Sequence, residues 1–273
     1  MEMQEKTFCD LAAYIKDKFG ICLGREKKTL LEGRLVKILT RLRLDSAEAY
    51  YDYLLQDTSG LADADLINAV STNHTFFMRE TDHFQCFSDS ALPYWYERIR
   101  DRDLRTWCAA CSTGQEAYTL AMLISDFFAL KEHDWDTTLL ATDISAAALA
   151  AARRGIYESR TVAQLPERWR KLYFQRLDSA HVQVAAKLRQ EIVFRQFNLI
   201  TPHFPFRRKF HVIFCRNVMI YFDKPTRRAL VDRFYQSLEP GGYLFIGHSE
   251  VLDRRETPFE YLRPSVYRKG GGA

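Results

Sequence analysis

The segment TWCAACSTGQEAYTL at residues 106–120 decides the fold class of this 273-residue chain. A short run of apolar and small residues ends at Ser112-Thr113-Gly114, and an amphipathic pattern begins directly after it, with Glu116 in the first turn. This order predicts a strand, a turn with few side chains, and then a helix. In α/β proteins such a junction lets a ligand approach the backbone and meet the helix N-terminus.

The segment is compatible with two chemistries. Residues 107–111, WCAAC, resemble a redox motif, but a thioredoxin-type cysteine lies at a helix start, where its pKa is lowered. Cys108 instead falls in the strand-like run, so redox chemistry is disfavoured. The loop has one glycine, and Glu116 would repel a phosphate, so a cationic or zwitterionic ligand fits better than a dinucleotide. A ligand-free turn, with its acid facing the helix dipole, explains the same pattern.

Composition narrows the class of protein. Hydrophobic residues make up 47% and charged residues 27% of the chain, as in ordinary globular proteins. The net charge of +4 does not by itself suggest nucleic acid. No apolar run is long enough to span a bilayer, and the N-terminus lacks the apolar core of a secretion signal. Six scattered cysteines favour reduced thiols and a cytoplasmic location.

A metal site is not predicted. His203, His211 and Cys215 are near one another in the sequence, but they lack the paired spacing of metal ligands.

Hydrophobic patterning divides the chain. Residues 1–75 predict helices only, residues 76–100 predict a linker and a helix, and residues 101–273 predict alternating strands and helices. The alternation predicts a mostly parallel sheet covered on both sides, and its last two strands, joined without a helix, predict an antiparallel edge pair. Residues 155–190 interrupt the alternation and predict an inserted subdomain.

Within the helical part, one face of a predicted helix at residues 26–43 is basic and carries Arg34, Lys37 and Arg41. Such a face is most often only solvated surface, although it could also dock an acidic partner. Residues 45–48 resemble a capping box that opens the next helix.

Polar residues follow two further predicted strands. Asp143 ends the strand LLATD, where an acid commonly binds ribose hydroxyls, although a helix N-cap at Asp143 or Ser145 explains it equally well. Arg216, Asn217 and Tyr221 follow the strand FHVIFC, at the edge where α/β proteins bind ligands. Tyr221 could also be a packing aromatic with its hydroxyl at the surface.

The segment STNHTFFMRE at residues 71–80 joins the two parts of the chain. Asn73, Thr75 and Arg79 alternate with apolar residues around two phenylalanines. The segment is either an anchored linker or a lid that covers a ligand and holds an anion through Arg79.

Together these motifs resemble the chemotaxis-receptor glutamate O-methyltransferases of the CheR type. The resemblance extends over about residues 71–250, in family order, and rests on these motifs: TNHTFFMRE, ACSTGQEAYTLAM, ATDIS with ALAAARRGIY, FNL, FCRNVMIYFDK and LEPGGYLFIGHSE. It implies an α/β fold: a class I S-adenosylmethionine-dependent methyltransferase sheet, mostly parallel with an antiparallel last strand. A small all-α N-terminal domain would precede the sheet, and residues 155–190 would form the family's β-subdomain.

The resemblance also implies a function and its residues. The cofactor would be S-adenosylmethionine, with S-adenosylhomocysteine as product, and the substrates would be glutamates on the cytoplasmic methylation helices of chemoreceptors. Arg79 and Tyr221 would lie at the methyl-transfer centre, and Arg34, Lys37 and Arg41 would dock the receptor. The residues expected to contact the cofactor are Asn73, Thr75, Arg79, Gly114, Glu116, Asp143, Asn198, Leu199, Arg216 and Asn217.

Some family members grip a receptor's terminal peptide with a glycine-rich loop in the β-subdomain. The equivalent stretch, FQRLDSAHVQVAAKLRQE at residues 174–191, contains no glycine, so we expect a tether-independent enzyme. We also expect a monomer that neither binds nucleic acid nor inserts into a membrane. The alternatives are a methyltransferase for another substrate and a non-catalytic scaffold that binds S-adenosylmethionine.

Overall fold

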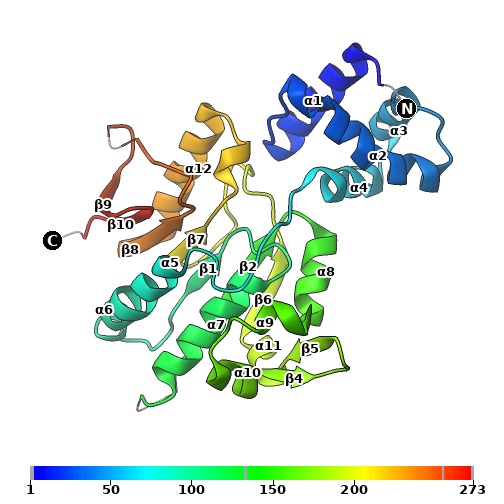
Figure 1. Cartoon of the computed structure of the whole chain (residues 1–273). Coiled ribbons are helices and arrows are strands. Elements are labelled where there is room, and N and C mark those ends of the chain that lie inside the picture. Colours follow the sequence, from blue (N-terminus) through cyan, green and yellow to red (C-terminus); the bar gives the residue numbers. More distant parts are fainter. Residues whose placement is uncertain (1–2, 132–133, 254, 272–273) are drawn as a thin grey trace.

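A computed structural model describes residues 3–131, 134–253 and 255–271, and it divides into a helical unit and a larger α/β unit (Figure 1). The helical unit consists of α1 (Glu5–Phe19), α2 (Lys28–Leu42), preceded by the short η1 (Arg25–Lys27), α3 (Ala47–Gln56) and α4 (Leu61–Val70). Phe8, Leu11 and Ile15 of α1 recur at helical spacing and are buried in the core of this unit. Gly20 ends α1 in the left-handed conformation, as expected for a C-cap.

The expected capping box at residues 45–48 is wrong in detail. Ser46, rather than Asp45, is the N-cap of α3, and its hydroxyl accepts a hydrogen bond from the Ala49 amide at 3.1 Å. Glu48 therefore lies one position too early to close the box. Its carboxylate instead accepts a hydrogen bond from the Thr7 hydroxyl at 2.8 Å and so connects α3 to α1.

The α/β unit is built on a seven-stranded sheet in the order β6-β2-β1-β7-β8-β10-β9. Five strands pair in parallel, and β10 runs antiparallel to both of its neighbours. The expected antiparallel pairing of the last two predicted strands, β8 and β10, is confirmed, but β9 lies outside β10 and forms the edge of the sheet. The strands are β1 (Thr106–Cys108), β2 (Leu139–Asp143), β6 (Ile192–Gln196), β7 (Phe210–Cys215), β8 (Leu238–Ile246), β9 (Phe259–Arg263) and β10 (Val266–Lys269).

Helices cover both faces of the sheet (Figure 1). They are α5 (Thr81–Cys86), η2 (Phe87–Ala91), α6 (Leu92–Tyr96), α7 (Gln115–Phe128), α8 (Ala146–Arg154) and α12 (Lys224–Ser237). Side chains alternate along the strands, so Cys108 belongs to the core under α5, α6 and α7, whereas Trp107 belongs to the core under α12. The Trp107 indole donates a hydrogen bond to the Thr142 hydroxyl at 2.9 Å, which fixes β1 against β2.

The insertion at residues 155–190 contains a three-stranded antiparallel sheet in the order β3-β5-β4, as the resemblance implied. Its elements are β3 (Ile156–Glu158), α9 (Ser159–Val162), α10 (Glu167–Tyr173), β4 (Phe174–Arg176), β5 (His181–Val184) and α11 (Ala186–Gln190). Asp126 of α7 holds this subdomain, because its carboxylate accepts hydrogen bonds from the Trp169 indole and the Tyr173 hydroxyl at 2.7 Å each. Among the described residues, no helix is long and apolar enough to cross a membrane.

Candidate functional site

A cleft lies at the carboxyl ends of β1, β2 and β7. In this region the helical unit and the linker at residues 71–80 meet the sheet (Figure 1). Nine of the ten residues expected to contact a cofactor line it, and so does Tyr221. The nine are Asn73, Thr75, Arg79, Glu116, Asp143, Asn198, Leu199, Arg216 and Asn217. With Tyr221, ten of the 23 residues that line the cleft were therefore expected from the sequence.

Gly114 is the tenth expected residue, and it is not part of the cleft lining. It is the N-cap of α7 with a φ of +100°. A Cβ at this position would lie 2.9 Å from both the Ala152 Cβ and the Tyr157 hydroxyl oxygen. Only glycine satisfies both restrictions, so this residue allows the turn after β1 to pack against α8 and the subdomain.

Asp143 ends β2 with a buried carboxylate that accepts backbone hydrogen bonds from both sides. One oxygen accepts from the Ser112 amide at 2.7 Å and the other from the Ser145 amide at 2.9 Å. The N-cap of α8 is Ser145, whose hydroxyl accepts from the Ala148 amide at 3.0 Å. Each Asp143 oxygen keeps a further lone pair for a hydroxyl donor. Burial raises the pKa of Asp143, against the opposing effect of these amides.

Arg216 is the electrostatic centre of the site. Its side chain is only 1% exposed and lies between two carboxylates. Nη1 is 2.8 Å from a Glu116 oxygen, and Nη2 is 2.9 Å from a Glu80 oxygen. Nη2 also donates to the Arg79 carbonyl, so the same guanidinium orients the backbone of the linker.

The two carboxylates respond differently to this guanidinium. Burial raises the pKa of Glu116 in spite of the charge on Arg216. Burial also acts to raise the pKa of Glu80, but the Arg216 charge and a hydrogen bond from Asn217 outweigh it, so this pKa is lowered. Glu80 was not identified from the sequence, although it ends the motif TNHTFFMRE. Its partner, the buried guanidinium of Arg216, lies 136 residues later in the chain, and only their pairing in the fold marks Glu80 as a site residue.

Asn217 and Tyr221 are positioned by a second buried carboxylate that the sequence did not reveal. Glu250 follows β8 and accepts hydrogen bonds from the backbone amides of Asn217 at 3.0 Å, Gly247 at 2.6 Å and Ile220 at 3.3 Å. Asn217 has a φ of +59°, and its side chain donates to Glu80 at 3.1 Å. The Glu250 carboxylate therefore fixes the turn after β7, including η3 (Met219–Tyr221).

Arg79 and Tyr221 lie in the cleft, as expected, with different constraints. Arg79 donates to the His74 carbonyl at 2.9 Å, and its guanidinium carbon is 6.0 Å from the Phe76 ring centre. Tyr221 is held through its backbone, because its carbonyl accepts a hydrogen bond from the Cys22 amide of the helical unit at 2.8 Å. The Tyr221 hydroxyl makes no hydrogen bond within the part of the chain that the structure describes. Both side chains can therefore turn polar groups toward a ligand.

The basic face of α2 is less free than its sequence suggested. Arg34 donates to the Val70 carbonyl and, at 3.1 Å, to the Thr72 hydroxyl, so it braces the start of the linker. Arg41 forms an ion pair with Asp65. Lys37 is exposed.

The two cysteines of the WCAAC segment are buried, and burial raises the pKa of both thiols well above the usual value. A raised pKa is the opposite of what a redox thiol requires, so the redox interpretation is wrong. The Cys108 thiol instead donates to the Glu116 carboxylate at 3.2 Å.

This combination of fold and site defines a class of protein. A seven-stranded sheet with one antiparallel strand next to β8, and a cleft lined by carboxylates at the ends of β1 and β2, are the features of class I S-adenosylmethionine-dependent methyltransferases.

Comparison with known proteins identifies the family. The chain matches the family "CheR methyltransferase, all-alpha domain" over residues 6–71 and the family "CheR methyltransferase, SAM binding domain" over residues 73–267. It is 37% identical over 262 residues to the chemotaxis protein methyltransferase of Borreliella burgdorferi, covering 95% of this chain and 92% of the relative. It is 33% identical over 270 residues to that of Escherichia coli, covering 98% and 92%. This chain belongs to the CheR methyltransferase family, and its cofactor is S-adenosylmethionine.

Proposed function

We propose that this chain methylates glutamate side chains on the cytoplasmic region of chemoreceptors, producing glutamate methyl esters and S-adenosylhomocysteine, for adaptation in chemosensory signalling. Relatives that cover nearly the whole chain are named chemotaxis protein methyltransferases, which supports the pathway. The observation that carries the proposal is the cleft, whose lining includes Arg79 and Tyr221 together with the carboxylates of Glu116 and Asp143.

The charges of the cleft fit the proposed cofactor. S-adenosylmethionine carries a sulfonium and an ammonium cation, together with ribose hydroxyls that can donate hydrogen bonds. Glu116 would attract the ammonium end, and Asp143 would accept hydrogen bonds from the ribose. The remaining contacts follow from the cleft lining: Asn73, Thr75, Arg79, Asn198, Leu199, Arg216 and Asn217. Gly114 would act indirectly, by shaping the turn that precedes Glu116.

The transfer step requires alignment more than proton transfer. Bound S-adenosylmethionine supplies the methyl group and carries the leaving group. A glutamate substrate, with an ordinary pKa near about 4.3, is already ionised and nucleophilic at neutral pH, so no general base is needed. The chain must orient one carboxylate oxygen and exclude water. Arg79 would hold the carboxylate or the cofactor, and the Tyr221 hydroxyl would fix the carboxylate with one neutral hydrogen bond.

Tyr221→Phe tests the transfer centre with the least disturbance, because its hydroxyl has no partner among the described residues. A neutral hydrogen bond contributes about 0.5–1.5 kcal/mol, so we expect turnover to fall by about 2- to 13-fold. Affinity for S-adenosylhomocysteine, measured by calorimetry, should stay unchanged. Radiolabelled methyl transfer to a receptor's cytoplasmic fragment gives the rate, and Tyr235→Phe, outside the cleft, is the matched control. Normal turnover in Tyr221→Phe would remove the residue from this role.

Arg79→Ala is expected to lower turnover more strongly than Tyr221→Phe, because it removes a charged donor from the same centre. Complete absence of methyl transfer in the unmodified chain, with normal calorimetric binding of cofactor, would instead favour a scaffold. Methylation of another substrate class alone would contradict the receptor assignment.

We further propose that the basic face of α2 docks the acidic methylation region of a receptor. Lys37 is the sharpest probe, because Arg34 also braces the linker and Arg41 is paired with Asp65. Lys37→Glu should raise the KM for receptor and leave kcat nearly unchanged, and the effect should shrink in high salt. Lys187→Glu, an exposed charge reversal in the subdomain, is the control. Equal KM values in both variants would contradict the docking role.

We propose that the enzyme is a monomer and does not require a receptor tether. The turn between β4 and β5 is closed by Asp178, whose carboxylate accepts from the Ala180 and His181 amides at 2.7 Å each, and the stretch lacks the glycine-rich loop of tethering relatives. Removing a receptor's terminal peptide should therefore leave the methylation rate unchanged. A large loss of rate after that removal would contradict this proposal, and sedimentation would test the monomer.

A further inference from the structure

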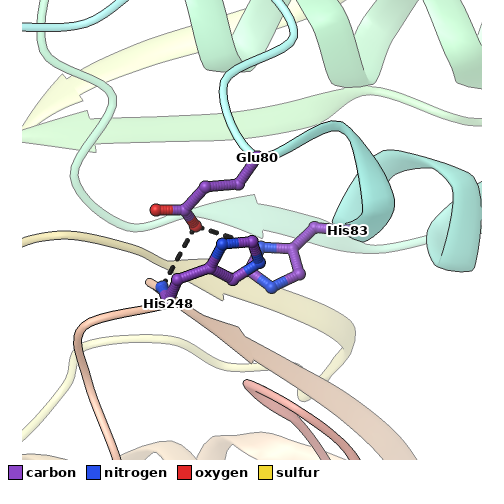
Figure 2. Close-up of side chains that lie close together, drawn as sticks. All are labelled: Glu80, His83 and His248. Atoms are coloured by element: carbon purple, nitrogen blue, oxygen red, sulfur yellow. Dashed lines mark hydrogen bonds and ion pairs between the residues drawn. The ribbon is translucent and has the colours of Figure 1, made fainter.

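Three ligand-type side chains that are distant in the sequence converge beside the cleft (Figure 2). Glu80 ends the linker, His83 lies in the first turn of α5, and His248 follows β8. One possible ligand atom from each residue lies within 4.8 Å of the other two. Sequence inspection did not find this group, because its members have no common motif spacing.

His83 is a buried histidine whose two ring nitrogens form no hydrogen bond with the described residues. It is 0% exposed. The nearest carboxylate oxygen, on Glu80, is 3.4 Å from Nδ1. A neutral imidazole has one lone pair that can accept a hydrogen bond or bind a metal ion. An unpartnered polar group at such depth is costly unless something binds it.

His248 has the environment of a metal-ligating histidine. Its Nε2 is 3.1 Å from Asp82, and because a carboxylate only accepts, this contact puts the ring proton on Nε2. The lone pair is therefore on Nδ1. Its ring centre is 4.6 Å from that of His83, and the two rings are nearly perpendicular (Figure 2). Histidine ligands almost always donate their other N–H to a carboxylate or carbonyl in this way.

We propose that Glu80, His83 and His248 form a binding site for a divalent transition metal ion, best matched by Zn²⁺, with Asp82 orienting His248. Two imidazoles and one carboxylate are a common zinc ligand set and leave a fourth position for water. The local charges permit a cation. Arg216 pairs with two carboxylates, those of Glu80 and Glu116, and the Asp82 carboxylate lies against His248.

The ligands must close slightly around the ion. Ligand atoms at about 2.1 Å from tetrahedral zinc are about 3.4 Å apart, less than the present spread. His248 can supply this movement, because its side chain is 47% exposed. To bind the ion, the Glu80 oxygen would give up its two longest hydrogen bonds, those from the His248 amide at 3.2 Å and from Arg216 Nε at 3.3 Å.

Metal binding would therefore be coupled to the cleft. The Glu80 oxygen that faces His83 also pairs with Arg216, and Arg216 pairs with Glu116 at the expected ammonium site. A metal ion bound to Glu80 would weaken the ion pair between Glu80 and Arg216, so the Arg216 guanidinium would pair more strongly with Glu116. Zinc should then weaken the binding of S-adenosylmethionine and slow methyl transfer.

Calorimetry with Zn²⁺ and visible absorption with Co²⁺ test the site on the full chain without any activity measurement. We expect one equivalent to bind and Co²⁺ to give the intense absorption of a four-coordinate site. His248→Ala should lower the affinity at least 100-fold, and Asp82→Asn about 10- to 100-fold. His203→Ala, an exposed histidine elsewhere, is the control. No saturable binding, or binding equal in His248→Ala and unmodified chain, would overturn the proposal.

A second titration separates the site from its consequence. S-adenosylhomocysteine affinity should fall several-fold when zinc is present and stay unchanged in His248→Ala under the same conditions. An unchanged affinity in the zinc-loaded chain would refute the coupling through Glu80, whatever the receptor substrate proves to be.

Discussion

Replacing Arg216 with methionine tests whether one buried guanidinium holds the site together. The side chain is 1% exposed and faces a carboxylate on each side, Glu116 at 2.8 Å and Glu80 at 2.9 Å. Methionine fills a similar length but removes the positive charge that pairs with both carboxylates. Breaking a buried ion pair in this way typically costs about 3–5 kcal/mol. For a domain of this size we expect the melting temperature to fall by roughly 6–20 °C.

The loss of stability in Arg216→Met should depend on pH. In the unmodified chain the pKa of Glu80 is lowered, so its contribution to stability is complete above the unfolded value near about 4.3 and is lost as the pH falls through the folded value. Without Arg216, burial raises the pKa of both carboxylates, and the folded variant gains stability as the pH falls below those raised values. The stability difference should therefore be largest near neutral pH and narrow toward pH 5.

Urea unfolding at several pH values, followed by tryptophan fluorescence and circular dichroism, measures this difference. The double variant Glu80→Gln with Arg216→Met is the control, because it removes one uncompensated charge and should recover part of the stability at neutral pH. A loss below about 1 kcal/mol, or a loss of constant size between pH 5 and 8, would refute the assignment of Arg216 as the compensating charge.

Three further outcomes follow from the packing of the site. Gly114→Ala should lower stability by about 1–3 kcal/mol because of its positive φ, whereas Gly33→Ala, with open space around it in α2, should raise it by up to about 1 kcal/mol; thermal melting checks both. Glu250→Gln places an amide group that donates hydrogen bonds next to three backbone amides that also donate, so it should disturb the turn that holds Tyr221. Turnover in the radiolabel assay should fall at least 10-fold, and little change would show that Glu250 does not position this turn. A thiol reagent at pH 8 should label exposed Cys9 quickly and Cys108 only on unfolding, and rapid labelling of Cys108 would contradict its burial.

Local sequence signals recovered the sheet because they act over a few residues. The apolar runs that end at Cys108 and Asp143, followed by helix starts, fix two neighbouring parallel strands and the edge where their ends meet. The strand that we missed, β9, has only Phe259 buried and four exposed residues, and its Glu260 and Arg263 are unlike a core strand. Its strand conformation comes from pairing with β10, which a local pattern does not encode.

Charges were harder to interpret than apolar periodicity. The sequence identified Arg216 as a cleft residue, but its partner Glu80 lies 136 positions earlier and nothing near either residue indicates the pairing. Arg34 illustrates the opposite error, because helical spacing puts it on a polar face whether it meets solvent or the Val70 carbonyl. Periodicity reports which face of a helix is polar, and only the fold decides what that face contacts.

The helical unit completes the cleft as well as carrying the proposed docking face. Its Phe19 and Ile21 line the cleft, its Cys22 amide holds the Tyr221 carbonyl at 2.8 Å, and its Lys18 carbonyl accepts a hydrogen bond from Asn198 at 2.8 Å. A receptor helix that docks on this unit would therefore press on the same segments that hold Tyr221 in place. Substrate docking and alignment of the transfer centre then share one interface, so a change in KM at α2 can carry a smaller change in kcat.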